Sequence, residues 1–252
     1  MSANNPFFDI SLLPYQAPRF DEINDSHYRP AFDEALRQKR ADVDAIVSQT
    51  AAPDFTNTVL ALEKSGAMLS RVNSVFFAMA SAHTNAYLQE LEEQFSTELA
   101  ALANDIWLND TLFARVESVW QDRAALDAES RRLVEETYQR FILAGARLTE
   151  TEKAELKALN TEAASLTSQF NQRLLAANKA GGLVVDYAHQ LEGLSADEIA
   201  TAAQAAAEKG LNDRWLIPLL NTTQQPVLSA LRNRQTRENL FNAGWTRTQK
   251  GD

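Results

Sequence analysis

One long uninterrupted helix constrains the fold of this chain more than any other feature. Thr149 and Glu152 form a capping box, because each side chain can accept a hydrogen bond from the other residue's backbone N–H. No glycine or proline follows until the Gly181-Gly182 pair, which predicts a helix of roughly 30 residues and about 45 Å. A helix of this length is typical of the wall of a large bundle. Its apolar residues are Leu156, Leu159, Ala163, Leu166, Phe170, Leu174 and Leu175.

The residues before this helix also follow a helical pattern. Residues 1–24 combine prolines with large apolar side chains, and we expect an extended segment laid over helices. A first helix is expected to begin near Arg29, with Pro30 in the first turn, where its missing N–H costs nothing. Apolar residues at helical spacing predict further helices after Asp54 or Thr56, after Thr84 or Asn85, after Asn109-Asp110, and from about Ala128 to Leu143.

The last third of the chain changes pattern. Leu183-Val184-Val185 follows the glycine pair and contains two β-branched valines, which predicts a strand, and a second strand is expected over 215–220. Pro218 implies an edge position. Between the two strands, the capping box of Ser195 and Glu198 opens a helix that stops at Gly210. We expect helix to restart at Pro226 and Thr236 to cap the final helix.

These patterns predict a mainly α fold. The chain is expected to form a multi-helix bundle with one long helix and a small two-stranded β element near the C-terminal third. Residues 1–180 would form a helical region, and residues 181–252 would hold the strand–helix–strand insertion with further helices after it.

Composition excludes several functional classes. The formal net charge is −10, so the clustered lysines and arginines that nucleic acids or anionic membranes require are not expected. There are no cysteines, which rules out a disulfide scaffold and a thiol nucleophile. No signal peptide and no apolar run near the ~20 residues of a membrane span is present, so the expected location is cytoplasmic.

Histidine spacing does not predict a zinc site. A zinc peptidase motif of the H-E-x-x-H type places two imidazoles one helical turn apart. The only histidines here are His27, His83 and His189, and none has a second histidine within a turn. We interpret His27 as a surface or capping residue, His83 as a helix-end residue and His189 as a solvated loop residue.

One uncharged stretch after the second strand is a candidate for peptide binding. It is Asn221-Thr222-Thr223-Gln224-Gln225. An edge strand can accept an extended peptide by β-addition, and nearby amides could bond its backbone. The alternative interpretation is a simple turn capped by threonine and asparagine.

Several separate sequence pieces form a recognisable combination along the chain. They are Asn5-Pro6-Phe7 with Leu13-Pro14-Tyr15, residues 27–32, Phe76-Phe77-Ala78-Met79, Leu159-Asn160 through Phe170-Asn171, residues 181–185, residues 219–226, residues 237–241 and Trp245-Thr246-Arg247. Together these pieces resemble the M3 (thimet-oligopeptidase-like) family of zinc metallopeptidases, and in particular its bacterial peptidyl-dipeptidase (dipeptidyl carboxypeptidase) branch. The resemblance covers essentially the whole chain and favours this branch over the oligopeptidase A type, which looks different around residues 221–226.

This resemblance implies an almost all-helical enzyme with a deep channel between two lobes and zinc on an H-E-x-x-H helix. Metal-activated water would attack the scissile carbonyl, and dipeptides would be released from the C-termini of oligopeptides. No residue here matches the zinc motif, so no catalytic or metal-binding residue can be assigned. Family members are much longer, so we expect this chain to be their N-terminal, channel-forming part, with only the first catalytic-domain helices, binding no zinc and inactive alone.

Two further expectations follow. If the chain is such a part, its last helix should expose Leu240, Phe241 and Trp245, or cover them by self-association. The alternative is a stand-alone helical peptide-binding or scaffold module without catalytic activity.

Overall fold

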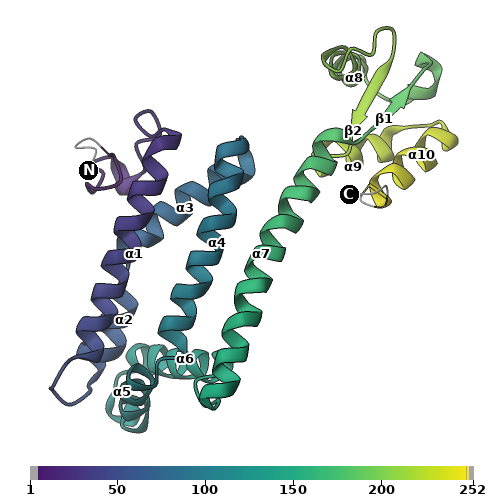
Figure 1. Cartoon of the computed structure of the whole chain (residues 1–252). Coiled ribbons are helices and arrows are strands. Elements are labelled where there is room, and N and C mark those ends of the chain that lie inside the picture. Colours follow the sequence, from purple (N-terminus) through teal and green to yellow (C-terminus); the bar gives the residue numbers. More distant parts are fainter. Residues whose placement is uncertain (1–4, 248, 250–252) are drawn as a thin grey trace. The chain divides into compact units, whose positions relative to one another are not determined.

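The computed structural model describes residues 5–247 and 249, and they form a mainly α fold with one small sheet, as predicted (Figure 1). The chain divides into two compact units, residues 1–168 and residues 169–252, and the division falls inside the long helix. In chain order the elements are α1 Asp25–Val47, α2 Ala61–Lys64, α3 Ala67–Ala82, α4 Ala86–Trp107, α5 Asp110–Gln121, α6 Ala128–Ala144, α7 Glu150–Ala180, β1 Gly182–Val185, α8 Ala196–Glu208, β2 Trp215–Pro218, α9 Asn221–Ala230 and α10 Arg234–Trp245.

Helix α1 begins four residues earlier than the position of Pro30 led us to expect. The Asn24 side chain accepts a hydrogen bond from Ser26 N at 3.2 Å, and the Asn24 N–H donates to His27 Nδ1 at 3.2 Å. This cap starts the helix at Asp25, so Pro30 lies inside it. The prediction of Pro30 in the first turn was wrong, because a strong polar cap outweighs the single backbone bond that proline removes.

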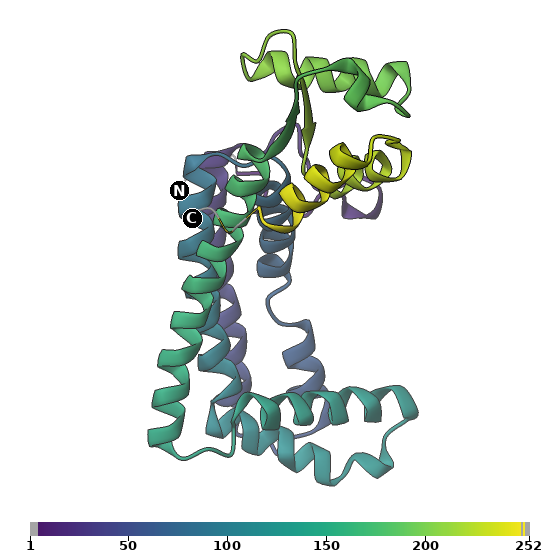
Figure 2. The same ribbon diagram turned by 90° about the vertical axis from the view of Figure 1, so that its right-hand side faces the viewer.

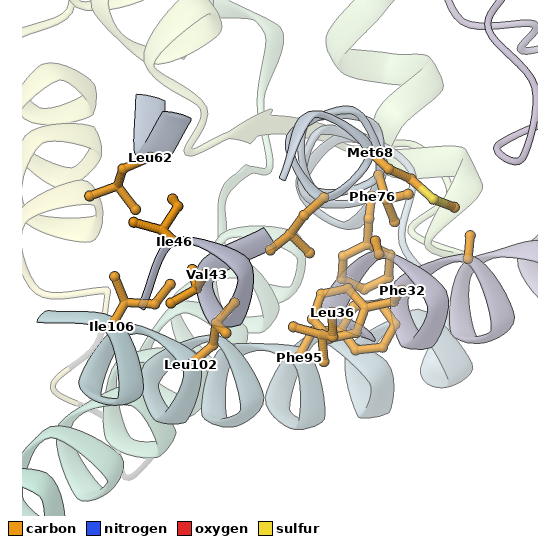
Figure 3. Close-up of a cluster of buried hydrophobic side chains, with 14 of the residues drawn as sticks. Phe32, Leu36, Val43, Ile46, Leu62, Met68, Phe76, Phe95, Leu102 and Ile106 are labelled. Carbon is orange, nitrogen blue, oxygen red and sulfur yellow. The ribbon is translucent and has the colours of Figure 1, made fainter. Parts of the chain in front are cut away.

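The core of the first unit is built by α1, α3 and α4, which pack against one another, together with α5 and α6. Phe32 and Phe95 are fully buried and stack at 3.7 Å between ring centroids, and Phe76 lies 4.6 Å from Phe95 (Figure 3). Ala31, Phe32, Ala35 and Leu36 are buried on one face of α1. Burial of these aromatic side chains is the main source of stability here.

The segment before α1 packs only in part. Phe7 is buried against Tyr28, whereas Leu12 and Tyr15 are fully exposed. The expected extended segment laid over helices is therefore restricted to its first residues.

Helix α7 begins with the predicted capping box, in which Thr149 N donates to Glu152 Oε2 at 2.8 Å. Its predicted apolar face is largely exposed, because Leu159, Leu166 and Phe170 keep 55%, 57% and 63% of their surface in water. The helix is thus formed by its cap and its backbone propensity, and it does not bury this face within the described residues.

The second unit is organised around a two-stranded antiparallel sheet. Gly182 pairs with Pro218 and Val185 with Trp215, as predicted for the two strands, and β1 and β2 are the only strands in the part of the chain that is described. Helices α8 and α10 lie on opposite sides of the strand pair (Figure 2). A small core of Val185, Leu191, Ile217, Leu219, Val227, Leu231 and Leu240 holds the unit together.

Two helix starts in this unit differ from expectation. Helix α9 begins at Asn221, so Pro226 lies inside it instead of starting it. Helix α10 is capped by Asn233, whose side chain accepts from Thr236 N at 3.0 Å, so Thr236 is not the cap. In both cases the helix begins directly after an extended residue, Leu220 or Asn233, and therefore before the proline or threonine that the sequence suggested as its start.

Candidate functional site

The candidate peptide-binding residues Asn221–Gln225 form the first turns of α9, directly after β2. The backbone N–H groups of Thr223 and Gln224 donate to Leu220 O at 3.0 and 2.7 Å. The segment is helical from Asn221 onward, so the alternative interpretation of a simple capped turn was wrong, and peptide binding by these residues stays a prediction. Extended backbone ends at Leu220 (φ −81°, ψ 140°), and helix follows at once.

The five side chains divide into an inner and an outer group. Gln224 donates through Nε2 to Leu240 O at 3.2 Å, and it packs so closely on Gly244 that any Cβ there would lie 2.0 Å from Gln224 Nε2. Thr223 is half-buried, whereas Asn221, Thr222 and Gln225 are exposed. Gln224 therefore joins α9 to α10, and the exposed three remain the residues that could meet a ligand.

The start of α9 offers backbone donors for a peptide. Leu220 supplies no side-chain cap, so the first N–H groups of α9 are not bonded by a cap and lie at the positive end of the helix dipole. The hydroxyl of Thr222 and the amides of Asn221 and Gln225 add donors and acceptors beside them. Such a set can bind carbonyl or carboxylate oxygens.

The sheet also provides open strand edges. In a two-stranded sheet each strand pairs on one side only, and the order here is β1-β2 within the described residues. Pro218 ends β2 opposite Gly182, as its missing donor requires. Val184 keeps 38% of its surface exposed. Binding of an extended peptide by β-addition to one of these unpaired edges therefore stays a prediction.

The three histidines lie in separate local structures. His27 closes the capping box of α1, His83 is the C-terminal residue that ends α3, and His189 stacks on Tyr187 at 5.7 Å between centroids. Across residues 5–247 and 249, no three side chains of the His, Cys, Asp or Glu type are grouped so that they could hold a metal ion. The donor set of a zinc centre does not fit the described residues, and no chemical step is assigned to zinc on this chain.

The predicted apolar patch on α10 is smaller than expected. Leu240 is fully buried in the core of the second unit, so its inclusion was wrong. Phe241 and Trp245 keep 52% and 77% of their surface exposed and stack at 5.8 Å. Their i, i+4 spacing puts both rings on one face of the helix.

A cavity that sequence patterns did not reveal lies in the first unit. It has a volume of about 880 Å³ and brings together Lys39 of α1, Ser65 after α2, Trp107 of α4 and Arg140 of α6. These residues come from four distant segments and belong to no motif, so only the tertiary structure identifies the group.

No helix among the described residues has both the length and the apolar character needed to cross a bilayer.

Comparison with known proteins relates the chain to peptidases. It is 68% identical over 252 residues, 99% of its length, to a dipeptidyl carboxypeptidase of Salmonella typhimurium, and 65% identical over 254 residues to a dipeptidyl carboxypeptidase of Escherichia coli. An oligopeptidase A of Haemophilus influenzae is 26% identical over 259 residues. The chain spans 37% of the length of the two dipeptidyl carboxypeptidases. No known family profile matches the sequence.

The resemblance drawn from the sequence is thereby confirmed. The relationship to the dipeptidyl carboxypeptidases extends over the whole chain, and the relationship to the oligopeptidases A is much weaker.

Proposed function

We infer, from this relationship to the dipeptidyl carboxypeptidases over its full length, that the chain is part of a peptidase of that group. We propose that the complete protein is a zinc-dependent peptidyl-dipeptidase that removes dipeptides from the C-termini of oligopeptides. The carrying observation is the 68% identity over 99% of the chain. Sequences this similar share a fold and, when both are complete, almost always a reaction.

We further propose that this chain supplies helical walls of the substrate channel and not the catalytic centre. The printed sequence has no H-E-x-x-H, and the described residues hold no trio of metal-ligand side chains. In the complete protein a zinc ion would polarise the scissile carbonyl and activate water. The role left to these helices is to shape and restrict access, with the exposed residues at the start of α9 as candidate contacts for substrate backbone.

An assay of two proteins side by side tests both proposals. The 252-residue chain and the full-length protein are each incubated with zinc and an N-blocked tetrapeptide, and released dipeptide is measured by mass spectrometry. We expect release by the full-length protein only. Dipeptide release by the chain alone would contradict the wall role, and no release by the full-length protein would contradict the peptidase assignment.

The alternative of a stand-alone peptide-binding module makes a different prediction. Such a module would bind an extended hexapeptide in calorimetry without cleaving it, and β1 or β2 would supply the open edge. We expect the chain alone to bind such peptides weakly, because one strand edge with one helix start buries little surface. A dissociation constant of about 10 μM or lower would favour the module.

Self-association is a separate proposal. Phe241 and Trp245 expose a stacked aromatic pair that a second copy could cover. Sedimentation over a range of concentrations measures the oligomeric state of the chain and of its Trp245→Ser variant. We expect the substitution to weaken any association.

A further inference from the structure

The cavity of the first unit that Lys39 and Arg140 line is chemically distinct from the peptide-binding candidate. Its walls come from α1, α2, α4 and α6, all within residues 39–143. None of its residues takes part in the function proposed above. Its volume of about 880 Å³ is in the range of small-molecule sites.

A lysine whose ammonium hydrogen-bonds to neutral oxygens lines this cavity. Lys39 Nζ donates to Ser65 Oγ at 2.5 Å and to Ser65 O at 3.3 Å, both of which are neutral oxygens. Burial lowers the pKa of Lys39, Arg140 lowers it further, and the carboxylates of Asp42 and Glu63 partly oppose this. The ammonium is therefore desolvated and incompletely compensated.

A second cation lines the same cavity. The guanidinium of Arg140 lies 4.1 Å from the centroid of the Trp107 ring, an interaction that orients a cation without neutralising it. Two carboxylates are also present, because Glu63 and Glu136 line the cavity. Glu136 forms an ion pair with Arg132 on its own helix.

The remaining wall is apolar. Leu62, Leu102 and Ile106 are buried members of the hydrophobic core that also line the cavity (Figure 3). Leu143 lines it as well and leaves 78% of its surface in water. Covering the exposed side chain of Leu143 with an apolar ligand chain is therefore favourable.

We propose that this cavity binds a monocarboxylate that carries an apolar chain. The carboxylate would accept hydrogen bonds from Lys39 Nζ and the Arg140 guanidinium, and the chain would lie against Leu102, Ile106 and Leu143. One negative charge matches the site better than two, because Glu63 and Glu136 would repel a dianion. A purely apolar ligand would leave the lysine desolvated and unpaired.

Binding of sodium decanoate, measured by calorimetry, tests the proposal, with decan-1-ol and decylamine as probes of equal chain length. We expect saturable 1:1 binding of decanoate, and weaker binding of the other two. Lys39→Gln is expected to weaken decanoate binding about tenfold, which corresponds to one charge-assisted hydrogen bond. The matched control is Lys64→Gln, an exposed lysine on α2 outside the cavity, which should leave binding unchanged.

Two further measurements keep the result interpretable. Circular dichroism must show that Lys39→Gln retains the helical content of the parent chain, and Arg140→Gln, at an exposed position, gives an independent variant expected to weaken binding. The proposal is overturned if decanoate does not bind at millimolar concentration. It is equally overturned if neither variant weakens the binding or if decylamine binds as well as decanoate.

Discussion

The ammonium of Lys153 contacts the carboxylate of Asp110, and this ion pair joins the first turn of α7 to the first turn of α5. The lysine side chain keeps only 4% of its surface exposed, whereas the Asp110 carboxylate is 68% exposed. Glu150 lies 3.4 Å from the same ammonium. A buried cation is thus held by two carboxylates that face solvent, which fixes the start of the long helix.

Lys153→Met should lower the free energy of unfolding of the first unit by about 1–2 kcal/mol, because it removes charge-assisted hydrogen bonds but keeps the apolar stem. Urea unfolding measures the change. Lys157→Met, one turn later on an exposed position of α7, is the control and should change stability by less than about 0.5 kcal/mol.

The same pair predicts a loss of stability at high pH. Hydrogen bonding to Asp110 raises the pKa of Lys153 above its ordinary value of 10.5. Its stabilisation is complete below the pKa of the unfolded chain and is lost as the pH rises through the folded pKa. Urea midpoints between about pH 10 and pH 12 should fall more steeply for the parent than for Lys153→Met, and below about pH 9 the two curves should run parallel. Parallel curves over the higher range as well would contradict the assignment.

Arg115 should be among the most sensitive positions of the first unit. It is 7% exposed, and its guanidinium donates to Gln49 O, Ala51 O, Asn57 Oδ1 and Thr58 Oγ1 at 3.0–3.3 Å. These contacts hold the segment that leads into the π-helical turn Phe55–Leu60.

Arg115→Met should cost about 3 kcal/mol, because it removes four hydrogen bonds of a buried guanidinium and leaves the buried hydroxyl of Thr58 without this donor. Arg115→Lys should recover little of this, since one ammonium cannot reach both pairs of oxygens. Chemical denaturation measures the free energy of unfolding of each variant, with Arg132→Met as the exposed control. A decrease below about 1 kcal/mol for Arg115→Met would be inconsistent with this role.

Substitutions at two glycines of the second unit can distinguish the cost of backbone strain from the cost of a steric clash. Gly193 and Gly210 both have positive φ, +106° and +71°. A Cβ on Gly193 would lie 2.1 Å from Ala230 O, whereas a Cβ on Gly210 would meet nothing within 4 Å. Gly210→Ala should therefore cost about 1 kcal/mol from strain alone, and Gly193→Ala substantially more. If Gly193→Ala and Gly210→Ala lowered the melting temperature equally, the backbone around Ala230 would have to move away from the added Cβ at no cost.

In the full-length protein, two substitutions can distinguish a candidate substrate contact, Thr222, from its structural neighbour, Gln224. Thr222→Ala should raise KM for oligopeptides several-fold and leave the melting temperature unchanged, because Thr222 is exposed. Gln224→Ala should lower stability by about 1 kcal/mol through loss of its bond to Leu240 O, with little change in KM. If neither variant changes KM, the start of α9 is not a substrate contact.

Local patterns in the sequence were sufficient to predict most elements. The capping boxes at Thr149–Glu152 and Ser195–Glu198 and the glycine stop at Gly210 act within one or two helical turns, so they can be recognised without the fold. Errors arose where two local signals compete, as at Pro30 and Pro226, because the relative strength of a cap and a proline depends on the backbone that precedes them.

Burial and site geometry were decided by tertiary structure. The apolar pattern of α7 identified a helix, yet whether Leu159 and Phe170 are covered depends on what packs there. The sequence by itself determined helix positions, the strand pair, the absence of a zinc motif and the relationship to peptidases. Only the tertiary structure shows the hydrogen bond from Gln224 to Leu240 O, the burial of Lys153 beside Asp110, and the placement of Lys39 and Arg140 in the same cavity. These contacts join segments separated along the chain, and their energies depend on distance and desolvation, which sequence spacing does not specify.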